Sequence, residues 1–150
     1  MIDTVRGTAE RIIDVVPLVM RSIRAKLHEL RAADINVHQF RAMLYINRNH
    51  GTSLSDVAAH VGVSLPTMSV LIDKLVDRKL VSRDARGGEK DRRKMCLFLT
   101  LQGQEELNVA YEFAQKFLMV KMSRLSKEEL KTISQAMQIL QDLFVLSPEK

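Results

Sequence analysis

The sequence predicts a mainly α-helical fold that contains one small β-hairpin. Three observations support this prediction. Apolar residues recur at helical spacing along most of the 150 residues. Capping signatures, each a Ser, Thr or Asn ahead of an apolar run, divide these stretches into separate helices. Residues 81–99 instead hold two short extended runs around a loop with adjacent glycines.

The first helix is expected from about Asp3 to Ala33, where apolar residues recur mostly every three to four positions. Pro17 lies inside this stretch. Proline removes one backbone donor and clashes with the preceding turn, so the helix should be kinked at Pro17 or begin near it. The expected apolar stripe consists of Ile12, Val15, Val16, Val19, Ile23, Leu27 and Leu30.

The second helix is expected to begin after Asn36, which is a favourable N-cap residue. Gln39 follows three positions later and can complete a capping box. The apolar residues that follow have helical spacing, and Gly51 is the expected terminator.

Residues 54–75, LSDVAAHVGVSLPTMSVLIDKL, have the pattern of two helices joined by a sharp turn. Ser53 is expected to cap the first helix, and Gly62 supplies the positive φ that such a turn requires. Ser64 is expected to cap the second helix, which carries Pro66 in its first turn. This arrangement is typical of a helix-turn-helix.

The second helix of this pair should end near Leu80 and should present short hydrogen-bonding side chains to solvent. Such groups are small enough to approach base edges and phosphates in a DNA groove. The candidates for the major-groove face are Ser64, Pro66, Thr67, Met68, Ser69 and Lys74. An ordinary helical hairpin, in which the short polar residues only cap a helix, is the alternative.

Two short strands, Val81–Asp84 and Met95–Leu99, are expected around the loop. Residues 83–94 contain six basic and three acidic side chains, a net charge of +3. A basic loop directly after a helix-turn-helix can place an arginine in a narrow minor groove. The candidate DNA-contacting residues of this loop are Arg86, Lys90, Arg92 and Arg93. A solvated charged loop without a partner is the alternative.

Two further helices are expected after the hairpin. Thr100 should cap a helix that reaches about Arg124, and Ser126 with Glu129 forms a capping box for the last helix, which Pro148 stops. The first and last helices are very apolar for a monomer of this size. A dimer interface is therefore predicted, with packing inside one chain as the alternative.

The overall charge favours a polyanionic partner. The formal net charge is +5 and the isoelectric point is about 9.6. Cys96 is the single cysteine, so an internal disulfide is excluded and a reducing cytoplasm is the expected location. The sequence shows neither a membrane-spanning run nor a signal peptide, and no membrane association is expected.

The run from Leu54 to Gly103 resembles the core of the MarR (multiple-antibiotic-resistance regulator) family, and the flanking helices match the layout of that family. The matching positions are Leu75, Leu80, Val81, Arg83, Asp91, Arg92, Arg93, Leu97, Leu99, Thr100 and Gly103. The resemblance implies a winged helix-turn-helix whose terminal helices form a two-fold dimer. It implies that the helix after Ser64 enters the major groove and that the hairpin enters the adjacent minor groove.

The resemblance also implies individual roles. Asp91 and Arg93 match an acid-x-Arg signature in which the acid orients the arginine toward DNA. Lys79 stands where glycine is frequent in the family, Val70 where a basic residue is frequent, and Pro17 is unusual in a dimerisation helix.

Relatives often bind a small aromatic or phenolic effector between the dimer helices and the DNA-binding lobe. The candidate effector-binding residues here are Met20, His38, Arg41 and Met43.

The sequence gives little support for a redox-sensing, metal-binding or catalytic site. Cys96 lies in an apolar strand, which disfavours a redox sensor. His28, His38, His50 and His60 show no metal-ligand spacing, so neither a metal nor another cofactor is expected. No phosphate-binding loop or nucleophile motif is present in the sequence, and the protein is not expected to be an enzyme.

The predicted function is that of a cytoplasmic transcriptional regulator, a repressor that binds a pseudo-palindromic operator on double-stranded DNA as a homodimer. Residues 1–150 would form one domain, with a DNA-binding lobe at about 36–100 and dimerisation helices at about 3–33 and 101–146. A protein-interaction module of the same fold and a non-specific architectural DNA binder are the alternatives.

Overall fold

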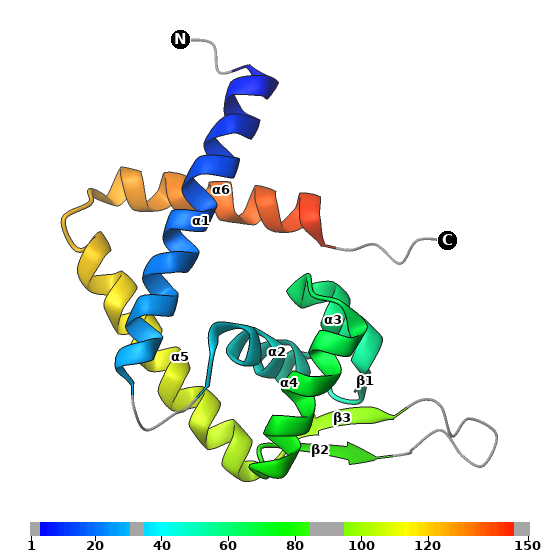
Figure 1. Ribbon diagram of the computed structural model, residues 1–150. Coiled ribbons are helices and arrows are strands. Elements are labelled where there is room, and N and C mark those ends of the chain that lie inside the picture. Colours follow the sequence, from blue (N-terminus) through cyan, green and yellow to red (C-terminus); the bar gives the residue numbers. More distant parts are fainter. Residues whose placement is uncertain (1–3, 31–34, 85–94, 146–150) are drawn as a thin grey trace. The chain divides into compact units, whose positions relative to one another are not determined.

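The computed structural model describes residues 4–30, 35–84 and 95–145. The chain forms two compact units, residues 1–114 and 115–150. The first unit contains α1 (Val5–Glu29), α2 (Val37–Arg48), β1 (Thr52–Ser53), α3 (Leu54–Val61), α4 (Leu65–Asp77), β2 (Val81–Asp84), β3 (Cys96–Leu99) and the first part of α5 (Leu101–Met122) (Figure 1). The second unit contains the end of α5 and α6 (Lys127–Phe144).

Helix α1 is continuous across Pro17, so the alternative that it begins near this proline is wrong. Thr4 caps the helix through a hydrogen bond that its side chain accepts from the backbone of Gly7. An ion pair between Arg6 and Glu10 supports the turns ahead of the proline. The helix ends at Glu29, earlier than the sequence predicts.

The core of the first unit lies among α2, α3, α4, the sheet and the first half of α5. Helix α1 contributes a single buried residue, Leu27. The largest fully buried side chains are Met43, Ile46, Met68, Ile72, Leu75, Leu80, Leu97, Leu107, Val57 and Val81. The spacing of the buried positions on each helix is the one that the apolar pattern predicts.

A three-stranded antiparallel sheet has the order β1-β3-β2. In the register, Val81 faces Leu99 and Asp84 faces Cys96. The strand at Val81–Asp84 confirms the predicted one, and β3 is one residue shorter than expected. The sequence analysis missed β1, because two residues are too short for a period-2 pattern to appear.

The two predicted capping boxes are confirmed, one at the start of α2 and one at the start of α6. At α2, Asn36 and Gln39 satisfy each other's backbone N–H groups, and Ser126 and Glu129 do the same at α6. The hydrogen bond that the Glu129 carboxylate accepts from the Ser126 backbone lowers the pKa of Glu129. Local sequence therefore determines where these helices begin.

Gly62 makes the turn between α3 and α4, with φ 81° and ψ 34°. The two helices are bent by 109° relative to each other. Within the part of the chain that the structure describes, no single helix is long and apolar enough to cross a membrane. The bent pair α3–α4 meets that test only when taken together. The apolar residues of this pair contribute to the core.

The end of α4 is joined to the start of α5 through backbone contacts. Lys79 has a φ of 61°, and it is the single non-glycine residue with positive φ in residues 4–30, 35–84 and 95–145. The Thr100 hydroxyl donates to the Lys79 carbonyl at 2.6 Å and accepts the Gly103 N–H at 3.0 Å. A Cβ at Gly103 would lie 2.8 Å from the Leu80 carbonyl carbon and still closer to its oxygen. Only glycine permits this approach.

In the second unit, α6 buries none of its residues. Apolar side chains recur along one stripe of α6 at Leu130, Ile133, Met137, Leu140 and Phe144, and all of them except the half-buried Leu140 are exposed. Ile139 and Leu143 are also exposed but lie away from this stripe.

Candidate nucleic-acid interface

The start of α4 is held by a hydroxyl cap. The Ser64 hydroxyl oxygen accepts the Thr67 N–H at 3.3 Å and donates to the Thr67 hydroxyl oxygen at 2.8 Å. Pro66 lies in the first turn, where its missing N–H leaves no helical bond unmade. The cap fixes the first turn of α4 beside the sharp turn at Gly62.

The outward face of α4 carries a single basic side chain, that of Lys74. Its exposed residues are Leu65, Pro66, Thr67, Val70, Asp73, Lys74 and Asp77. Ser69 is half-buried. The structure therefore leaves Ser64, Pro66, Thr67 and Lys74 of the predicted set accessible, and Ser69 partly so.

Met68 was predicted to be on the groove face, and the structure contradicts this assignment. Its side chain is fully buried, with 0% exposure, and it belongs to the core together with Ile72 and Leu75. One residue along a helix corresponds to about 100° of rotation, so a neighbour of exposed residues can point inward. The centre of the exposed face is Val70, which is 55% exposed.

An ion pair links α4 to the hairpin. The Arg83 guanidinium on β2 donates to the Asp73 carboxylate on α4. Asp73 would otherwise place a bare negative charge on the outward face of α4. Arg83 is one of the basic residues of the segment 83–94, and the sequence does not predict this pairing because ten positions separate the two residues.

The five predicted loop residues Arg86, Lys90, Asp91, Arg92 and Arg93 lie outside the described residues. Strands β2 and β3 stay paired as far as Asp84 and Cys96. The segment 85–94 therefore connects two strand ends that are held together.

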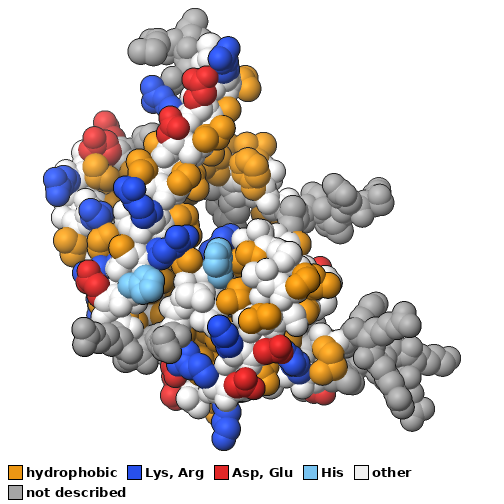
Figure 2. Space-filling view, in the orientation of Figure 1, with side chains coloured by type: hydrophobic (Ala, Val, Ile, Leu, Met, Phe, Trp, Pro, Cys, Tyr) orange, Lys and Arg blue, Asp and Glu red, His pale blue; other side chains and the backbone are white. Residues whose placement is uncertain are grey.

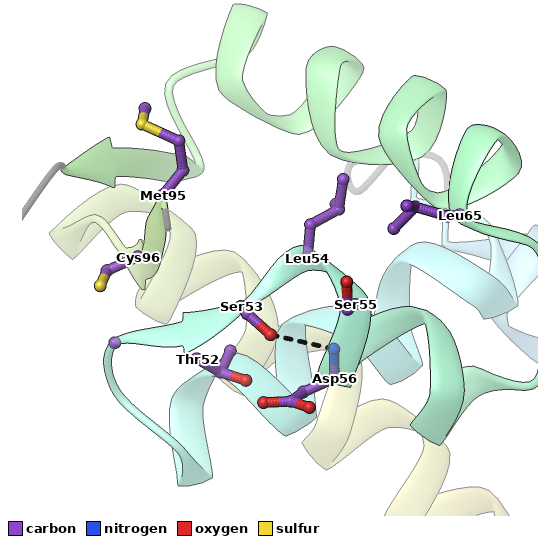
Figure 3. Close-up of a pocket in the computed structure, with 9 residues that line it drawn as sticks. Thr52, Ser53, Leu54, Ser55, Asp56, Leu65, Met95 and Cys96 are labelled. Carbon is purple, nitrogen blue, oxygen red and sulfur yellow. Dashed lines mark hydrogen bonds between the residues drawn. The ribbon is translucent and has the colours of Figure 1, made fainter. Parts of the chain in front are cut away.

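A cavity of about 570 Å³ lies between the start of α3, the start of α4 and β3. Leu54 and Leu65 point toward each other there, and Ser53 accepts the Asp56 N–H at 3.1 Å (Figure 3). Thr52, Ser53, Ser55 and Asp56 are the polar residues of its lining. The half-buried Cys96 lies at its border.

The structure places the predicted effector-binding residues in different surroundings. Met43 is fully buried in the core, so its assignment to an open crevice is wrong. Arg41 binds the last carbonyls of α3, donating to Val61 at 3.1 Å and to His60 at 3.3 Å. His38 has a buried Nδ1 without a hydrogen-bond partner among the described residues. Met20 is half-buried on α1.

His60 stacks on Tyr45 with ring centroids 4.4 Å apart. Burial lowers the pKa of His60, and the neighbouring Arg41 and Arg48 lower it further. The same surroundings disfavour the protonated form of His60. In the described part of the chain, no group of three His, Cys, Asp or Glu side chains is placed to hold a metal ion.

Apolar side chains also lie exposed along α1. Figure 2 shows them along this helix, interspersed with charged groups. The exposed large apolar residues of α1 are Val5, Ile13, Val15, Val16, Leu18 and Val19. Exposed apolar stripes on two terminal helices are typical of surfaces that another chain covers.

The chain resembles known proteins along most of its length. Residues 33–94 match the MarR family. The uncharacterized HTH-type transcriptional regulator YfiV of Bacillus subtilis is 31% identical over 108 residues. The alignment covers 71% of this chain and 66% of that regulator, so the chain spans just under two thirds of its length. These matches are to transcriptional regulators rather than enzymes, as expected from the sequence.

Solved structures share the fold. A MarR transcriptional regulator from Methanosarcina mazei Go1 has a TM-score of 0.77 at 22% identity, covering 89% of this chain and 95% of that one. A Mycobacterium tuberculosis MarR family protein, solved in complex with salicylic acid, has a TM-score of 0.70 at 18% identity, covering 91% and 96%. The predicted mainly helical winged-helix fold is thereby confirmed.

Proposed function

Because the chain belongs to the MarR family of transcriptional regulators, we propose that it is a homodimeric regulator that binds specific DNA sequences. The outward face of α4 carries this proposal. Its first turn is fixed by the Ser64 cap, and no part of the described chain covers the face formed by Pro66, Thr67, Val70 and Lys74. A helix presented in this way fits the major groove of B-form DNA.

The hairpin supplies the second contact in this proposal. Arg86, Lys90, Arg92 and Arg93 would contact phosphates and the minor groove, and Asp91 would orient Arg93. Replacing Arg92 with Ala should weaken binding to all sequences and reduce the salt dependence by about one counterion. A variant that retains the wild-type affinity and salt slope would exclude Arg92 from the interface.

Dimerisation through the terminal helices would place two copies of α4 about 34 Å apart, one turn of DNA, on a pseudo-palindromic operator. The exposed stripes of α1 and α6 support this. Ile133→Glu places a charge on the α6 stripe and should shift the mass measured by light scattering from dimer to monomer. Gln135→Glu, a charge on the same helix away from that stripe, is the matched control. A wild-type monomer, or a dimeric Ile133→Glu variant, would contradict this arrangement.

We propose repression as the mode of regulation and a small aromatic or phenolic acid as the effector. The salicylic acid complex of the Mycobacterium tuberculosis relative supports this ligand class. Met20, His38 and Arg41 remain the candidates for the effector site. A ligand can release DNA only if it binds better to the DNA-free conformation. Salicylate should then weaken operator binding by the wild-type chain and have less effect on His38→Ala.

The first test is fluorescence anisotropy with DNA from the upstream region of the gene and a scrambled duplex of equal length, at two salt concentrations. Tighter binding to the upstream DNA, with one dimer per site, supports a specific regulator. Equal, salt-dependent binding to both duplexes would favour an architectural DNA binder. Absence of binding at low salt would favour a protein-interaction module.

A further inference from the structure

We infer that α4 recognises its operator mainly through the C5 methyl groups of thymine, with Val70 as the central contact. The inference rests on the proposed function, because it names what the DNA-facing helix reads. The contacts it names lie in the major groove alone, and none of them involves residues 85–94.

The composition of α4 limits how it can read bases. Every residue of Leu65–Asp77 is described, and this helix contains one cation, Lys74, and no Arg, Asn or Gln. Bidentate recognition of guanine by arginine, and of adenine by asparagine or glutamine, is therefore unavailable to α4. Asp73 is engaged by Arg83, which leaves it poorly placed to accept from a cytosine amino group. Asp77, the other acid of α4, is its last residue and lies away from the N-terminal turns through which a recognition helix contacts bases.

One exposed apolar side chain lies at the centre of the outward face of α4. Val70 is 55% exposed there, whereas Leu65, 48% exposed, points into the cavity toward Leu54. Pro66, Val70 and Lys74 follow one another at intervals of four residues, so they form one row along the outward face. Val70 occupies the middle of that row, opposite the buried Met68 and Ile72.

The polar groups at the start of α4 are partly occupied. Ser64 accepts the Thr67 N–H, and its hydroxyl donates to that of Thr67. Each hydroxyl therefore has less capacity left for a base than a free one. The Thr67 methyl group adds to the apolar surface beside Val70.

Thymine is the base whose major-groove edge carries an apolar group. A valine pressed against cytosine would bury the N4 amino donor without a partner, which is unfavourable. The same valine against thymine buries methyl against methyl. Lys74 lies on the outward face in the last turn of α4, and the positive end of the helix dipole lies at the opposite end, beside Ser64. Both favour contact with phosphates, so the proposal commits to duplex DNA rather than to a second copy of the chain.

The test begins with selection of a binding site from a random duplex library by the full-length protein. Each thymine of the selected half-site is then replaced with deoxyuridine, which removes the C5 methyl and keeps the base pair. At one or two positions the Kd should rise about fourfold per methyl removed. The affinity of Val70→Ala should be insensitive to the same replacement.

Val109→Ala is the matched control, because Val109 is a helical valine with 52% exposure on α5. It should retain the wild-type sensitivity to deoxyuridine. A selected site at which every thymine can be replaced without loss would overturn this inference and leave the proposed function intact. Equal sensitivity in Val70→Ala would overturn the assignment to Val70. Failure to select any sequence would overturn the proposed function and this inference together.

Discussion

The helix-turn-helix and the last helix use apolar residues in opposite ways. Helix α4 buries Met68, Ile72 and Leu75 completely, whereas α6, which is longer, buries nothing. The two helices have similarly regular apolar spacing, so the pattern alone does not distinguish them. The difference teaches that the first unit supplies its own core, while α6 has an apolar face that requires another surface.

The largest expected effect on stability is the difference between replacing a buried methionine of α4 and an exposed methionine of α6. Met68→Ala should lower the free energy of unfolding by about 2–5 kcal/mol, because the Met68 side chain is fully buried and its removal leaves a cavity in the core. Met137→Ala should change the unfolding of the first unit by less than about 0.5 kcal/mol, because Met137 is 54% exposed. Urea titration at low protein concentration measures both. Similar losses in the two variants would show that α6 is covered within one chain.

A second contrast compares two glycines. Gly103→Ala should lower the free energy of unfolding by about 3 kcal/mol, because the added methyl group would overlap the Leu80 backbone. Gly7→Ala is the control, since its Cβ would approach only the Thr4 side-chain oxygen, at 3.3 Å, in a helix that favours alanine. Thermal unfolding compares the two. Equal melting temperatures would mean that α5 can move away from Leu80 at no cost.

Lys79 permits a change that should strengthen the first unit. Its φ of 61° is costly for a residue with a Cβ, by about 1–2 kcal/mol. Lys79→Gly should therefore raise the free energy of unfolding by about 1 kcal/mol, after the entropy cost of glycine is subtracted. Chemical denaturation gives this value, and Lys74→Gly, inside α4, should have the opposite sign. If Lys79→Gly instead lowered the free energy of unfolding, the backbone at Lys79 would not be strained.

The smallest effect concerns pH. The pKa of His60 is lowered in the folded chain, so the unfolded chain binds the proton more readily. The contribution of His60 to stability is therefore complete above its unfolded pKa of about 6.5 and declines as the pH falls through that value toward the folded pKa. His60→Phe keeps a ring next to Tyr45 but cannot titrate. The difference in unfolding midpoint between wild type and variant should change between pH 8 and pH 5.5, and a constant difference would refute the argument.

Local signals in the sequence predicted more than long-range ones. The Asn36–Gln39 and Ser126–Glu129 boxes and the Gly62 turn act within three or four residues, and the structure confirms them. The Asp73–Arg83 pair joins two elements that no single-sequence pattern relates.

Single-residue errors have a geometric origin. The apolar spacing of α4 assigns Met68 to the buried face, and its additional assignment to the groove face conflicts with that spacing and with its burial. The end of α4 was also placed too late, because the chain leaves the helix at Arg78 and Lys79 without a glycine to mark it. Lys79 stands where glycine is frequent in the family, which marks the position as unusual. The sequence alone does not show that Lys79 adopts a positive φ there.

The junction of Leu80 with Gly103 has a mechanical consequence. Backbone atoms meet there directly, and the Thr100 hydroxyl and the pair of Arg78 with Glu106, 3.3 Å apart, fasten the same two segments. A joint of this kind has no side chain that can rotate to absorb movement. A tilt imposed on the first turns of α5 is therefore transmitted to the end of α4 as rigid rotation, so the orientation of α4 follows that of the start of α5.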